Sequence, residues 1–269
     1  MLNGTGIVCL NKSPEFETRS MAEAFLTSVQ ADPNILTICK QALESPNSFV
    51  QFHSSVIIKQ VICRNTSESK NEWIHYLTLF LIQRNSTLER FVKTCVLNSI
   101  ATLLKTNLIN SDNYTNSGSE IILFIQKFLL SNCDPLQIHI GLELVVSVVN
   151  QFADNKHTGI AIPLQIHRKL QRTFQEDCLH VIFALVVQNL EKHVENSTEL
   201  DMRICQAALA CSDLILNWDF NDCYSHVMDS KPNPVLEKLT NEAPLLTDKW
   251  RAILMFPGFL QLFFNVILI

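Results

Sequence analysis

The side chains in this sequence that could do chemistry are its histidines and cysteines and one adjacent pair of carboxylates. A metal site needs several such ligands close together, and it is usually marked by short spacings such as CxxC or HExxH. Neither spacing occurs. Cys178 and His180 lie two residues apart on an expected helix, so their side chains point to different faces and are not expected to share a metal. Glu176 and Asp177 begin the same helix, where acidic side chains interact favourably with the helix dipole.

The sequence motifs of phosphate binding and nucleophilic catalysis are also missing. No GxGxxG, GxxxxGK(S/T) or GxSxG spacing occurs. We therefore expect no catalytic residue, no cofactor and no bound metal, and we predict that the protein is not an enzyme.

The composition favours a helical protein. Hydrophobic residues make up 47% of the chain and charged residues 17%, which leaves ample apolar surface for a core, and only six glycines occur. Few glycines favour helices joined by short loops, because tight turns and phosphate loops depend on glycine. The net charge of −5 comes without a block of basic residues, so no nucleic-acid partner is expected. The nine cysteines mostly occupy apolar positions, which indicates reduced thiols in an intracellular protein.

Apolar residues recur with helical periodicity over most of the chain. One stripe runs from Leu179 through Ile182, Phe183 and Val186 to Val194. Such wide stripes are typical of helices that pack against two neighbours. The periodicity predicts helices near residues 15–30, 33–45, 47–63, 70–84, 86–106, 118–131, 134–153, 163–173, 175–195, 198–217, 234–240 and 247–269.

Capping residues mark where several of these helices begin. Asp32–Pro33 and Asp134–Pro135 each place a carboxylate before a proline that suits the first helical turn. The spacings Ser86–Glu89 and Ser117–Glu120 predict capping boxes, and Thr198 with Asp201 predicts a weaker one.

The predicted helices come in pairs. Pairs that begin near residues 47, 86 and 134 are separated by roughly 40–48 residues, the period of HEAT and armadillo repeats. A single pair cannot bury its own apolar stripe, so neighbouring pairs must stack. The predicted fold is therefore all-α, a right-handed superhelical solenoid of HEAT-like antiparallel helix pairs. We expect it over residues 15–269 as one domain, preceded by a flexible segment at 1–14.

Two features can be interpreted in more than one way. Trp218 continues an apolar stripe and is expected in the core, whereas Trp73 stands among polar residues and fits either the core or a contact surface. The mostly apolar run 252–269 falls short of the roughly 20 apolar residues of a membrane-spanning helix, and Pro257 and Gly258 interrupt it. A core helix that lacks its covering repeat is favoured over a membrane anchor, so we expect no stable membrane insertion.

The opening segments resemble the first repeats of the importin-beta superfamily. The matching residues are Arg19, Ala22, Glu23, Leu26, Pro33, Ile38–Lys40, Leu43 and Glu44, the stretch 47–62 and Leu81–Arg84. Later segments are similar to the exportins of that superfamily, namely Phe174–Leu179 with Ile182 and Phe183, Leu216–Phe220, Lys249–Arg251 and Leu262–Phe264. The resemblance covers roughly residues 16–266 and implies an importin-beta N-terminal-like region followed by further HEAT repeats. Members of the superfamily are several times longer, so we expect a partial chain, truncated at its C-terminal end.

This resemblance implies a nuclear export receptor that binds Ran in its GTP form, protein cargo and nuclear pore proteins, and that shuttles between nucleus and cytoplasm. In this superfamily the inner helices of the first repeats contact Ran, and they correspond here to 33–45, 70–84 and 118–131. Polar residues on these helices are the Ran-binding candidates: Lys40, Lys70, Glu72, His75, Arg84 and Lys127. Each of them also fits an ordinary solvated helix face. The alternatives are a HEAT/armadillo-like protein-binding scaffold unrelated to nuclear transport and a truncated product without function.

Overall fold

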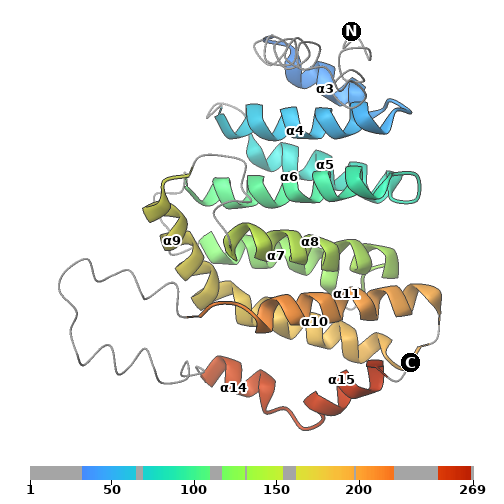
Figure 1. Ribbon diagram of the computed structural model, residues 1–269, viewed down its shortest axis with the longest axis vertical. Coiled ribbons are helices and arrows are strands. Elements are labelled where there is room, and N and C mark those ends of the chain that lie inside the picture. The colour runs from blue at the N-terminus through green and yellow to red at the C-terminus, as the bar shows by residue number, and fades with distance from the viewer. Residues whose placement is uncertain are drawn as a thin grey trace, which may run out of the picture. The chain divides into compact units, whose positions relative to one another are not determined.

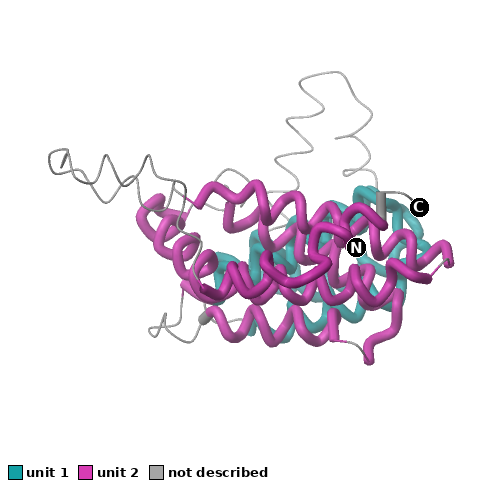
Figure 2. Tube along the Cα trace, turned by 90° about the horizontal axis from the view of Figure 1, so that it is seen from below, with its two compact units in different colours: residues 1–107 teal, residues 108–269 magenta. Residues whose placement is uncertain are grey.

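The computed structural model describes residues 32–64, 69–109, 117–130, 132–153, 162–196, 198–220 and 248–267, and all regular elements within them are helices (Figure 1). The chain divides into two compact units, residues 1–107 and 108–269 (Figure 2). The helices predicted at 15–30 and 234–240 and the flexible segment predicted at 1–14 lie outside the described residues. The extent and handedness of one continuous solenoid stay predictions.

Unit 1 contains α3 (Ile35–Leu43), α4 (Ser48–Arg64), α5 (Lys70–Arg84) and most of α6 (Arg90–Ile109). The loop between α3 and α4 is short, and the two helices pack against each other. α5 and α6 are antiparallel, because Lys70 and Asn71 at the start of α5 bond to Thr106 and Asn107 near the end of α6.

The helices α4 and α6 run in the same direction with a constant offset. Three contacts join them, and their partners are 43 or 44 residues apart: Cys95 with Phe52, Ser99 with Ser55, and Thr106 with Cys63. This offset matches the predicted repeat period. Equivalent helices of successive pairs therefore stack in register, which confirms the HEAT-like arrangement within unit 1.

Unit 2 is built from α7 (Ser117–Leu129), α8 (Pro135–Ala153), α9 (Leu164–Thr173), the π-helix η3 (Phe174–Leu179), α10 (His180–His193), α11 (Glu199–Leu216), α14 (Asp248–Leu254) and α15 (Phe259–Ile267). η3 and α10 lie along α7, since Cys178 Sγ and Asn189 Nδ2 donate to the carbonyl oxygens of Gly118 and Leu129, each 60 residues earlier. α11 packs against both α8 and α10. Helix pairs therefore stack in unit 2 as they do in unit 1.

The crossing of α7 and α8 depends on a glycine. A Cβ added to Gly141 of α8 would lie 2.5 Å from Phe128 Cβ and 2.9 Å from Leu129 Cδ2 of α7. No ordinary carbon contact is that short, so only glycine permits the two helices to approach this closely.

Three predicted boundaries were wrong. The helices predicted at 163–173 and 175–195 form one helical backbone, because no proline or glycine interrupts it and η3 continues it with a wider turn. The predicted capping box at Ser86 does not form, since Thr87 and Leu88 donate their N–H groups to Arg84 O and α6 begins only at Arg90. The helix predicted at 247–269 breaks at Pro257 and Gly258, where Gly258 has a φ of 92°.

Two other predicted caps are confirmed, whereas the capping box at Ser117 stays a prediction, because the side chain of Ser117 lies outside the described residues. Asp134 Oδ1 accepts the N–H of Leu136 at 2.8 Å, and Thr198 Oγ1 accepts the N–H of Asp201 at 3.1 Å. At α3, Asp32 Oδ1 accepts the N–H of Asn34 at 2.7 Å, although the helix begins at Ile35.

Helix α8 is the one helix among the described residues that is long and apolar enough to cross a membrane. Its apolar window is 61% buried inside unit 2, as expected of a core helix, and this length and composition alone are weak evidence for a membrane span.

Candidate partner-binding surface

Five of the six predicted Ran-binding residues lie on α3 and α5 of unit 1. Helix α5 begins at Ser69, whose Oγ accepts the N–H of Glu72 at 3.4 Å. Its apolar side is buried through residues such as Trp73, Leu77 and Leu81. Helical periodicity then leaves the opposite side exposed through Glu72, His75, Leu79 and Gln83, whereas Asn71 and Arg84 are exposed near the two ends of the helix.

Two electrostatic contacts join α3 to α5. The Lys40 ammonium lies 4.6 Å from the ring centroid of Trp73 and 4.9 Å from that of Tyr76, which places it over two aromatic faces. One turn later on α3, Glu44 forms an ion pair with Arg84. Both partners of this pair are about half exposed, so the pair contributes only modestly to stability.

Within unit 1 the structure leaves four of the six candidates exposed, spread along α3 and the length of α5. Lys40, Glu72, His75 and Arg84 are exposed on α3 and α5. Trp73, which had two possible interpretations, is core: it is 6% exposed and lies beneath Lys40 rather than in solvent.

Lys70 differs from the other candidates because it is buried. Its Nζ donates to Thr106 O at 3.1 Å, and burial lowers its pKa. The side chain therefore ties the start of α5 to the end of α6.

Lys127 is exposed on α7 in unit 2. It lies one turn beyond Leu123, which is 59% exposed, and three residues before Leu130, which is 45% exposed. This stretch of α7 combines a cation with exposed apolar side chains.

Sequence reasoning did not single out Glu44, Tyr76 or Leu79 as members of the α3–α5 face. The Lys40–Glu44 spacing of four residues indicates a shared helix face, so Glu44 was accessible from the sequence. Leu79 was not, because an apolar residue at helical spacing is assigned to the core, yet it is 41% exposed.

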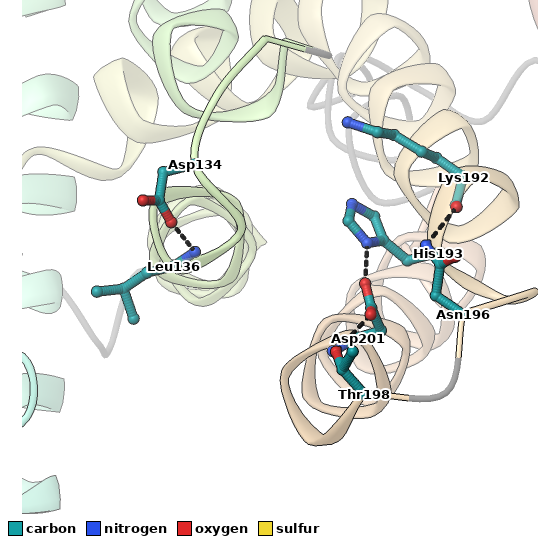
Figure 3. A network of polar contacts seen from close by, with 7 residues as sticks. All are labelled: Asp134, Leu136, Lys192, His193, Asn196, Thr198 and Asp201. Carbon is teal, nitrogen blue, oxygen red and sulfur yellow. Dashed lines mark hydrogen bonds and ion pairs between the residues drawn. The ribbon is translucent and has the colours of Figure 1, made fainter.

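Unit 2 holds a buried polar network, shown in Figure 3. His193 Nδ1 lies 2.5 Å from Asp201 Oδ1, and Thr198 Oγ1 donates to the other carboxylate oxygen. Hydrogen bonds from Thr198 and then His193 lower the pKa of Asp201. These residues join the end of α10 to the start of α11, with His193 and Asp201 buried and Thr198 exposed at the first turn of α11.

No cluster of three or more metal-ligating side chains occurs among the described residues. Cys178 is buried against Gly118 O, whereas His180 is partly exposed near Lys249. The two side chains therefore face different surroundings, as their spacing predicts.

The later segments that resemble exportins meet in the core of unit 2. Phe174 stacks on Phe152 with centroids 4.2 Å apart, and its ring also contacts Trp218. Trp218 Nε1 donates to Gln175 Oε1 at 3.0 Å, and Trp250 packs edge-on against Phe220. These segments are distant in sequence and adjacent in space, so they define the packing of unit 2. Trp218 is core, as predicted.

Comparison with known proteins identifies a relative. Exportin-7-B of Xenopus laevis is 24% identical over 272 aligned residues, which include 97% of this chain. The chain is a distant homologue of an exportin of the importin-beta superfamily. The match does not single out one exportin, and the chain spans 24% of the length of the Xenopus protein. No family model matches the chain. No solved structure matches it.

Proposed function

We propose that this chain belongs to a nuclear transport receptor that binds Ran-GTP and protein cargo. The observation that carries the proposal is the alignment with an exportin over 97% of the chain, because it covers both units rather than one common helix pair. The in-register stacking of helix pairs supports it. Such a receptor makes and breaks no covalent bonds itself. Ran-GTP and cargo each stabilise the same conformation of the solenoid, so that binding of one promotes binding of the other.

The finer proposal is a receptor similar to exportin-4 that binds nuclear pore proteins and shuttles between nucleus and cytoplasm. It is based on the resemblance of the later segments described above. The Ran-contact set remains Lys40, Lys70, Glu72, His75, Arg84 and Lys127. Lys70 is unsuited to testing this set, because its substitution would also break the contact between α5 and α6.

The first test is capture of purified Ran by this chain, with Ran loaded with a non-hydrolysable GTP analogue or with GDP. GTP-selective capture is expected. Capture in neither state would contradict Ran binding by this chain, and equal capture in both would contradict GTP-selective binding; either result would favour the scaffold or the non-functional product.

The second test locates the contact. Lys40→Glu combined with Arg84→Glu is expected to weaken Ran-GTP binding roughly tenfold or more, because both cations are exposed on one face. Arg203→Glu on α11 is the control, since Arg203 is also exposed and also paired with a glutamate. Equal affinities of the double variant and the wild type would remove the α3–α5 face from the site.

A further inference from the structure

The two exposed cations of the α3–α5 face differ in their electrostatic surroundings. Arg84 is ion-paired with Glu44. Lys40 contacts the rings of Trp73 and Tyr76, and no carboxylate of the described residues pairs with it. Because Lys40 is exposed, ammonium hydrogens that do not face the rings can donate to an incoming acceptor. Lys40 is thus available to a partner, whereas Arg84 is already occupied.

One apolar side chain of α5 is exposed on the same side of the helix as Tyr76. Leu79 is 41% exposed and is three residues beyond Tyr76 and five residues before Arg84 on α5. The exposed Leu79 and half-buried Tyr76 therefore offer apolar surface near Lys40, and this combination suits a partner segment that presents an apolar side chain next to a carboxylate.

The charge of unit 1 also favours an acidic partner. Its described residues carry more cations than anions: Lys40, Lys59, Arg64, Lys70, Arg84, Arg90, Lys93 and Lys105 against Asp32, Glu44, Glu72 and Glu89. Over the full sequence of residues 1–107 the excess is smaller, with ten Lys and Arg against eight Asp and Glu, whereas the chain as a whole has a net charge of −5. An acidic segment is attracted to this part of the chain.

We propose that the α3–α5 face docks an acidic segment of Ran-GTP, and that Glu44 competes with this segment for Arg84. The inference rests on the proposed function and adds a regulatory feature to it. A guanidinium paired with one carboxylate has fewer donors left for a second, so the partner must displace Glu44 before it gains the Arg84 contact. The pair is about half exposed and correspondingly weak, which makes this displacement feasible.

The test is the affinity of Ran-GTP for Glu44→Gln, measured by titration against the wild-type chain. Removing the competitor is expected to tighten binding about two- to fivefold, the range that corresponds to a surface ion pair. Glu199→Gln is the matched control, because it also removes one negative charge and one exposed Glu–Arg pair, but on α11. The gain is expected to vanish when Arg84→Gln is added to Glu44→Gln.

The outcomes separate the two proposals. An unchanged or weaker affinity of Glu44→Gln, while the wild type still binds Ran-GTP selectively, overturns the competition and leaves the proposed function intact. A gain that persists in the double variant, or that Glu199→Gln reproduces, also overturns it, since the effect would then be one of net charge. Absence of Ran-GTP binding by the wild type overturns both.

Discussion

Substitution of Gly141 by alanine should destabilise unit 2. The new Cβ would lie 2.5 Å from Phe128 Cβ, about 1 Å inside an ordinary carbon contact of roughly 3.5–4.0 Å. Phe128 Cβ is attached directly to the α7 backbone, so rotation of a side chain cannot relieve the clash, and α7 and α8 must separate. Overpacking of this kind costs typically 1–3 kcal/mol, and the severity of the overlap places it near about 3 kcal/mol.

Alanine also favours the helix over glycine by about 1 kcal/mol, which leaves a net loss of about 2 kcal/mol. Urea unfolding followed by circular dichroism at 222 nm measures this difference. Ala210→Gly, at an exposed position inside α11, calibrates the helix-propensity contribution in the same protein. A Gly141→Ala variant as stable as the wild type, or more stable, would refute the close approach of α7 and α8.

Three further predictions concern unit 2. Asp201→Asn should destabilise the protein by about 2–4 kcal/mol at pH 7 by breaking the buried contact with His193. Hydrogen bonds lower the pKa of Asp201 in the folded protein, so this stability is present above the usual carboxyl pKa and is lost as the pH falls through the lower folded pKa. The difference in stability between the variant and the wild type should therefore shrink below about pH 4. An equal difference at pH 7 and pH 3 would contradict this. Trp218→Phe should cost about 1 kcal/mol in urea unfolding, since Gln175 Oε1 loses its donor, and an unchanged midpoint would show that this bond contributes nothing. Leu260→Gln with Phe264→Gln should reduce light scattering at unchanged helix content, because these side chains are 69% and 59% exposed; unchanged scattering would exclude this surface as the cause of self-association.

The last of these replaces a simpler expectation from the sequence. An apolar C-terminal helix without its covering repeat suggests that removal of the whole tail would improve solubility. The structure shows that the tail is partly core, because Trp250 and Phe259 pack on Phe183 of α10. Its removal would uncover Phe183, so point substitutions on the outer side of α15 are the better test.

Most of the helices were predictable because their apolar stripes are long and their caps are local. Asp134 before Pro135 and Thr198 before Asp201 need only a few neighbouring residues to act, so their effect is visible in the sequence. The boundary at Thr173 was not predictable in this way. The continuous backbone there needs no more than the absence of proline and glycine, but the contacts that accompany it, from Phe174 to Phe152 and Trp218, involve residues that are distant in the chain.

The candidate surface was only partly predictable for the same reason. The sequence predicted Lys40 and Arg84 as polar residues of α3 and α5, but it contained no sign that Glu44 pairs with Arg84 or that Lys40 lies over aromatic rings. It could not distinguish Lys70 from its exposed neighbours either, because the burial of Lys70 depends on α6.

The offsets between stacked helices also bear on how a gene can lengthen such a protein. Contacts between equivalent helices span 43 or 44 residues in unit 1, and 60 residues in unit 2, where α9 is inserted between α8 and η3. Loop-closure entropy grows only with the logarithm of length, so this longer connection adds about 0.3 kcal/mol to the entropy cost of stacking. An extra helix between two repeats is therefore almost neutral for stability. Insertions at such junctions can persist until their exposed surfaces acquire a use.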